Sequence, residues 1–176
     1  MFRRWAEARM YRRTVQIAVS ALRRASRAAD ALEKLKLLDL AEQKLKDALW
    51  LDPEASQDGF QTGLEEIQRS RRETLSNQAL RAVERLVDAA SADPGDPDAF
   101  LRPAGELLAF VSHYAPEEAN AQVLSARFRD LGGQQPPYQP VTPLREQYRR
   151  SSAGIGCAVF LVGLSVALVV FHIVLQ

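Results

Sequence analysis

Apolar residues recur at steps of three and four along most of the chain, which is the spacing of amphipathic α-helices. The pattern is clearest over residues 37–51, where the apolar side chains share an arc of about 120° on a helical wheel. The apolar set is Leu37, Leu38, Ala41, Leu45, Ala48 and Leu49, and the set predicted to face away is Asp39, Glu42, Gln43, Lys46 and Asp47. Asp52-Pro53 ends this helix, because proline has no amide hydrogen and disfavours helix in the residue before it.

The same spacing over residues 15–35 predicts a preceding helix, and a connection near Leu35–Leu38 would join the two as an antiparallel hairpin. Thr62 and Glu65 have the spacing of a capping box at the start of a further helix. Pro116 opens a last helix, which Gly132-Gly133 would end. Residues 15–131 are therefore predicted to form an all-α domain, a bundle of antiparallel helical hairpins.

Residues 153–175 have a different character, because this stretch of 23 residues carries no charge at neutral pH. As a helix it would be about 35 Å long, enough for the roughly 30 Å hydrocarbon core of a bilayer. We expect one transmembrane helix here. Arg145, Arg149 and Arg150 precede it and only Gln176 follows, so the positive-inside rule predicts a single-pass, tail-anchored protein with a cytoplasmic N-terminal domain and its C-terminus across the membrane.

Two pairs of small residues within this stretch are four positions apart, Gly154 with Ala158 and Gly163 with Ala167. Such spacing lets a second membrane helix approach closely. The alternative is that glycine and alanine are simply common in membrane helices.

Residues 132–152 separate the helical domain from the predicted span. The first twelve, GGQQPPYQPVTP, hold four prolines and no charge, which predicts an extended spacer of roughly 30–40 Å. It would let the domain stand off the membrane or lie along a neighbour. Arg145, Arg149 and Arg150 make the rest of the linker a basic juxtamembrane segment.

Charge is unevenly distributed although the net charge is only +1. Residues 1–36 carry ten Lys/Arg and three Asp/Glu, whereas residues 37–131 carry ten and eighteen. The basic segment at residues 1–14, with Arg9 and Arg12, could meet anionic lipid headgroups, dock on an acidic protein with Trp5 as its buried anchor, or be a solvated helix. Nucleic acid is not expected as a partner, because the acidic middle of the chain would repel phosphate.

Ala41, Leu45, Ala48 and Pro53 have the spacing of the second helix of a tetratricopeptide repeat. The spacing recurs at Ala82, Leu86, Ala89 and Pro94, and in part at Ala119, Val123 and Ala126. Residues 15–131 at most thus resemble degenerate tetratricopeptide-like hairpins. The resemblance implies stacked helical pairs with a groove that binds other proteins.

Motifs for catalysis or ligand binding are not found. One cysteine and two histidines are too few for a four-ligand Cys/His zinc site, and the sequence has no glycine-rich phosphate loop. We therefore expect no enzyme, no cofactor, no metal and no small-molecule substrate.

These features together predict a non-catalytic accessory or scaffold subunit of a multi-subunit membrane complex, by analogy a respiratory or photosynthetic one, with integral membrane subunits as partners. The alternative is a free membrane-tethered adaptor that recruits soluble proteins through the repeat-like groove. Seven residues are predicted to make protein contacts: Trp5, Arg9, Arg12, Trp50, Pro136, Pro137 and Tyr138.

Overall fold

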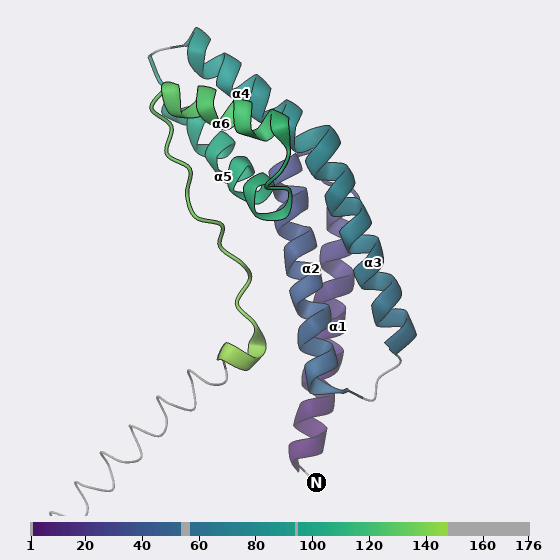
Figure 1. Cartoon of the computed structure of the whole chain (residues 1–176). Coiled ribbons are helices and arrows are strands. Elements are labelled where there is room, and N and C mark those ends of the chain that lie inside the picture. Colours follow the sequence, from purple (N-terminus) through teal and green to yellow (C-terminus); the bar gives the residue numbers. More distant parts are fainter. Residues whose placement is uncertain (1, 54–56, 94, 148–176) are drawn as a thin grey trace, which may run out of the picture. The chain divides into compact units, whose positions relative to one another are not determined.

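The fold is all-α in a computed structural model that describes residues 2–53, 57–93 and 95–147, and every regular element in those ranges is helical. The elements are α1 (Phe2–Ala25), α2 (Ala31–Leu51), α3 (Gln57–Thr74), the π-helical segment η1 (Leu75–Ala79), α4 (Leu80–Ala92), α5 (Asp98–Tyr114) and α6 (Ala119–Asp130) (Figure 1). Residues as far as Val141 form one compact unit, which contains all of these helices.

Helices α1 and α2 form the expected antiparallel hairpin, but their connection lies earlier than the sequence suggested. The chain turns at residues 26–30, where the Asp30 carboxylate accepts a hydrogen bond of 2.7 Å from the backbone amide of Glu33 and caps α2. The predicted connection near Leu35–Leu38 is wrong. Leu35 and Leu38 are both buried, and burial of these two leucines favours a helix that continues through them.

Helix α2 is the central helix of the unit, since it packs against α1, α3 and α5. Its apolar face is confirmed for Leu37, Leu38, Ala41, Leu45 and Ala48, which are buried, whereas Leu49 is half-buried. The prediction that Asp39 and Asp47 face away is wrong, because both carboxylates are buried. A helix covered on several sides has little free surface, so positions outside the main apolar stripe are buried as well.

Helices α3 and α4 continue into each other through η1, so residues 57–92 follow one helical path. Within it, the hydroxyls of Thr74 and Ser76 donate to the carbonyls of Ser70 and Arg72 four residues earlier. Such back-bonding competes with the regular ladder and accompanies local distortion of helices. The helix start predicted at Thr62 is wrong, because α3 begins at Gln57.

Two apolar clusters form the core, and α2 contributes to both. One joins the first turns of α2 to η1, α4, α5 and α6, with Val83, Leu108 and Phe128 among its fully buried side chains. The other joins α1, α2 and α3 around Ala18, Ala41 and Ile67.

Burial follows the repeat-like spacing only in α2. In α4 the buried residues are Leu80 and, one position beyond those of the pattern, Val83, Val87 and Ala90. In α6 the pattern residues Ala119, Val123 and Ala126 are exposed, whereas Ala121, Leu124 and Phe128 are buried.

The described part of the chain contains no helix that is both long and apolar enough to cross a bilayer. The stretch predicted to span it, residues 153–175, lies outside the described residues, and so do Arg149 and Arg150.

Truncation of a core leucine should measure the contribution of the first cluster to stability. We expect Leu108→Ala to lower the free energy of unfolding by about 2–5 kcal/mol, because it removes buried methyl groups and leaves a cavity. Val123→Ala is the matched control, since Val123 is 61% exposed and its truncation should change stability by less than about 0.5 kcal/mol. Denaturant unfolding followed by circular dichroism compares the two. Equal effects would contradict the burial of Leu108.

Candidate functional site

A buried carboxylate on α2 organises the most polar part of the interior. Asp39 Oδ1 accepts hydrogen bonds from Arg71 Nη2 of α3 at 2.9 Å and from the hydroxyl of Tyr114, the last residue of α5, at 2.8 Å. Asp39 Oδ2 accepts a hydrogen bond from the hydroxyl of Tyr138, and the two tyrosine hydroxyl oxygens lie 2.8 Å apart. Four segments that are far apart in the sequence therefore meet at one side chain.

Arg71 holds this cluster together from the other side. Its guanidinium also donates to Glu42 and lies 4.2 Å from the centre of the Tyr114 ring, a cation–π distance. The side chains of Arg71 and Asp39 are each only 6% exposed. A buried ion pair of this kind is tolerated only when hydrogen bonds replace the lost water, and the two tyrosines provide them for Asp39. Here the name Asp39 cluster refers to Asp39, Glu42, Arg71, Tyr114 and Tyr138.

Tyr138 brings the proline-rich segment into this cluster. After α6, Gly132 adopts a φ of +82°, a conformation that favours glycine, and the chain continues without helix or strand through residues 134–141, hereafter the strap. The Tyr138 ring stacks on His113 at a centroid distance of 4.0 Å and meets Phe110 edge-on at 5.3 Å. The strap is thus fastened to α5 and α2 of its own chain.

Close approach of the strap to α5 depends on Gly105. A Cβ atom at that position would lie 3.2 Å from Pro136 and 3.3 Å from the carbonyl oxygen of Gln134. Further along α5, the side-chain amide of Gln135 donates to Ser112 Oγ at 3.1 Å. The sequence left two arrangements open for this segment: it could let the domain stand off the membrane, or it could lie along a neighbouring protein. Its first ten residues do neither and lie against their own helical unit.

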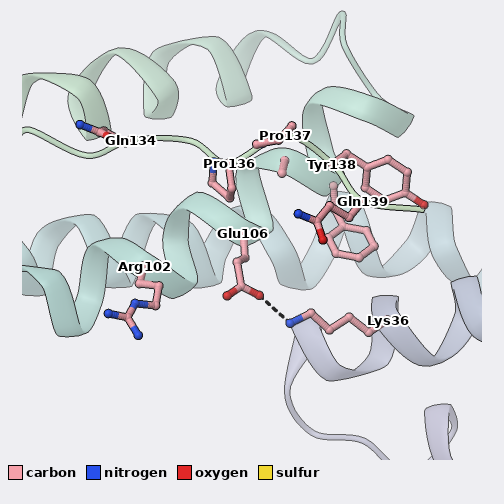
Figure 2. A pocket seen from close by; sticks show the side chains of 10 residues that line it. Lys36, Arg102, Glu106, Gln134, Pro136, Pro137, Tyr138 and Gln139 are labelled. Carbon is pink, nitrogen blue, oxygen red and sulfur yellow. Dashed lines mark hydrogen bonds and ion pairs between the residues drawn. The ribbon is translucent and has the colours of Figure 1, made fainter. Parts of the chain in front are cut away.

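A pocket of about 540 Å³ lies between the strap, α5 and α2. Lys36 Nζ and Glu106 Oε2 form an ion pair of 2.5 Å that ties α2 to α5 at its edge (Figure 2). The strap contributes Gln134, Pro136, Pro137, Tyr138 and Gln139, and α5 adds Arg102, Ala109 and Phe110. The pocket has an apolar wall of proline and aromatic rings and a charged edge.

The protonation states in the Asp39 cluster follow from burial and from the neighbouring charges. Burial, together with the hydrogen bond to Asp39, raises the pKa of Tyr114 to about 12 and raises the pKa of Tyr138 as well. Burial would raise the pKa of Glu42, but hydrogen bonds from Lys46 and Arg71 outweigh it and lower that pKa below its ordinary value. At neutral pH the two tyrosines of the cluster are therefore neutral, whereas Glu42 and Arg71 are charged.

The structure places the predicted contact residues in three different regions. Pro136, Pro137 and Tyr138 line the pocket. Arg9 and Arg12 are exposed on α1, and Trp5 lies in the same helix, with its side chain outside the described part. Trp50 is 45% exposed near the end of α2, about 16 Å along the helix axis from Asp39, so it does not belong to the cluster.

The remaining predicted residues lie toward the C-terminus. Arg145 is exposed in the helical turn at residues 144–147. Gly154, Ala158, Gly163 and Ala167, predicted for helix packing in the membrane, fall outside the described residues.

Sequence reasoning missed the cluster itself. Asp39 stands between Leu38 and Leu40 in an apolar run, which is a signal that it could be buried. No pattern connects it to Arg71 or Tyr114, because these residues are 32 and 75 positions away. Among the described residues, no group of three or more His, Cys, Asp or Glu side chains is arranged to hold a metal ion.

Comparisons with protein families, curated proteins and solved structures find no match to this chain.

Removal of one hydroxyl should loosen the strap. We expect Tyr138→Phe to lower the free energy of unfolding by about 1.5 kcal/mol, the low end for a hydrogen bond to a charged group, and to speed amide exchange across residues 134–141. Tyr11→Phe is the matched control, because it also removes one tyrosine hydroxyl but at a ring that packs against Phe60 of α3 and is not part of the Asp39 cluster. Hydrogen exchange read by mass spectrometry reports both variants. Unchanged exchange in the strap of Tyr138→Phe would contradict its attachment through Asp39.

The raised tyrosine pKa values predict a loss of stability at alkaline pH. Because the neutral tyrosines are favoured in the folded state, their contribution is complete below pH 10.0, the ordinary pKa, and is lost as the pH rises toward about 12. The unfolding free energy should therefore fall over this window in the wild type and fall less steeply in Tyr114→Phe/Tyr138→Phe. Parallel pH profiles for the two proteins would contradict the assignment.

Proposed function

We propose that this protein is a non-catalytic accessory or scaffold subunit, anchored in a membrane through residues 153–175, whose helical unit contacts integral membrane subunits on the cytoplasmic side. The anchor is supported by the sequence, since 14 of these 23 residues are Leu, Ile, Val or Phe and none is charged. Each such residue near a helix centre favours insertion by roughly 0.3–0.6 kcal/mol.

The attachment of the strap is the observation that carries the proposal. Because the chain is held to the helical unit as far as Val141, only residues 142–152 separate this unit from the proposed span. Eleven residues reach at most about 40 Å even when fully extended. The helical unit would therefore stay close to the membrane surface. There it can contact the exposed parts of neighbouring membrane proteins more readily than distant soluble proteins.

Exposed aromatic surface supports a partner for the helical unit. Trp50 is large and nearly half exposed, and tryptophans of this kind are enriched at the energetic centres of protein interfaces. Pro137 and Pro140 of the strap are exposed as well, in a segment whose path is already fixed. A partner that binds this surface need not order the chain, which lowers the entropic cost of association.

The second candidate is a free tethered adaptor that uses a tetratricopeptide-like groove. The pocket beside α5 favours it, because its proline and aromatic lining is typical of peptide sites. Part of that lining is the chain's own strap, however, so the site is not the open groove between stacked helical hairpins that the resemblance implies. This makes the accessory subunit the better-supported of the two.

The anchor is tested by alkaline carbonate extraction of membranes that contain the full chain. We expect the wild type to stay with the membrane pellet and Leu164→Arg/Val166→Arg to be extracted, because each arginine near a helix centre costs roughly 2.5–3.5 kcal/mol of insertion. Leu164→Ala/Val166→Ala is the control and should remain in the pellet. A wild type found in the soluble fraction would refute the anchor.

The mode of action is tested by mild detergent extraction followed by native electrophoresis. A large, stoichiometric and salt-resistant complex is expected, and its yield should fall in Trp50→Ala and not in Val123→Ala. A monomer, or a mixture that dissociates in salt, would instead favour the free adaptor. Turnover of a substrate by the isolated protein would contradict both.

A further inference from the structure

Helix α1 carries a row of arginines on the face that points away from the core. Its buried residues are Thr14, Ala18, Ala21 and Ala25, which share one side of the helix. At 100° per residue the opposite side carries five exposed arginines within an arc of about 120°, and a sixth follows just beyond the end of the helix. This arginine ridge consists of Arg9, Arg12, Arg13, Arg23, Arg24 and, just beyond the end of the helix, Arg27.

The ridge is long, straight and free of negative charge from its own helix. From Arg9 to Arg27 it extends about 27 Å, with the small polar residues Gln16 and Ser20 in its middle. Glu7 is the only acidic residue of α1 and points toward the buried side of the wheel. From the neighbouring helix, Glu33 of α2 approaches Arg24 at 3.6 Å, and both of these side chains remain more than half exposed.

Two further features fit an anionic ligand at this face. Near the start of the ridge, a surface hollow is lined by three arginine side chains with Ala8 and Gln16. Arginine side chains that line a hollow can donate paired hydrogen bonds to phosphate or carboxylate oxygens. Ile17 and Val19, on the two flanks of the ridge, are 37% and 40% exposed, which is a large apolar surface for a helix that already has a buried face.

We propose that the arginine ridge binds the headgroups of an anionic lipid bilayer, so that α1 lies on the membrane surface. This inference rests on the proposed membrane anchor. The described residues of the ridge include no aromatic anchor of the kind that centres protein interfaces, and a row of six like charges favours an anionic surface. A lipid surface needs no complementary shape, and each arginine close to it strengthens binding by about fivefold.

Tethering makes this weak, distributed attraction effective. A helical unit held to the bilayer by a short chain meets headgroups at a high local concentration, so the second contact needs little affinity of its own. The attraction between the ridge and the headgroups is electrostatic and is therefore screened by salt, because the Debye length falls from about 10 Å at 0.1 M to about 3 Å at 1 M. The ridge thus gives α1 a contact with the membrane that depends on lipid charge and on ionic strength.

The experiment uses the full chain in vesicles, with Cys157→Ser as background and a single cysteine as reporter. Gln16→Cys places the reporter in the ridge, and Val123→Cys places it on exposed α6. The reaction of each cysteine with a membrane-impermeant maleimide is timed in vesicles of phosphatidylcholine alone and of phosphatidylcholine mixed with phosphatidylserine. Only chains with an outward-facing helical unit are counted.

We expect the phosphatidylserine mixture to slow the reaction at Gln16→Cys at least about fivefold, corresponding to one arginine contact, and high salt to abolish the effect. The reporter at Val123→Cys should react equally in both vesicles. In Arg9→Gln/Arg13→Gln/Arg23→Gln/Arg27→Gln the protection should disappear. Glutamine is a good helix former, and circular dichroism checks that α1 remains folded.

Equal reaction rates at Gln16→Cys in the two kinds of vesicle would overturn the proposal. Protection in native membranes but not in phosphatidylserine vesicles would also overturn it and would assign the ridge to an acidic protein. If residues 153–175 do not anchor the chain, it will not float with vesicles of phosphatidylcholine alone. In that case, the reaction rate at Gln16→Cys with vesicles that contain phosphatidylserine still tests binding by the ridge.

Discussion

The buried ion pair between Asp39 and Arg71 is the interaction on which the arrangement of the helices and the strap depends. Removing two charges from water costs several kcal/mol for each ion, so the pair persists only because further groups surround it. Tyr114 and Tyr138 donate to the aspartate, and Glu42 shares the arginine. These partners lie on the next turn of α2, on α5 and on the strap. The need to surround the buried charges with hydrogen-bonding groups therefore specifies how α2, α3, α5 and the strap assemble.

Attachment of the strap changes the function that a proline-rich segment would otherwise have. An uncharged segment rich in proline and glycine acts as a spacer when nothing binds it. Here Tyr138 and the close contact at Gly105 fix its first part on α5, which leaves a short tether toward the proposed span and forms one wall of the pocket at Lys36 and Glu106. The same sequence thus limits how far the helical unit can reach and helps to form its pocket.

Uneven charge has two separate roles in this molecule. In the interior, the carboxylates of Asp39 and Glu42 on α2 contact the guanidinium of Arg71 on α3, so the Asp39 cluster stabilises the packing of these two helices. On α1, arginines are gathered on the exposed side, where a row of like charges attracts anions. A net charge near zero conceals this division, and only the local distribution indicates a surface suited to anionic partners.

The sequence by itself determined the all-α class, the buried stripe of α2 and the end of α6 just before Gly132, because each of these follows from spacing or backbone preference within a few residues. Tertiary structure alone decided that Asp39 is buried, that the α1–α2 turn lies at residues 26–30 and that Tyr138 fastens the strap. Those outcomes depend on partners up to 99 positions away. A local pattern predicts which residues can be buried. The partner of a buried charge depends on the packing of segments that are distant in the sequence.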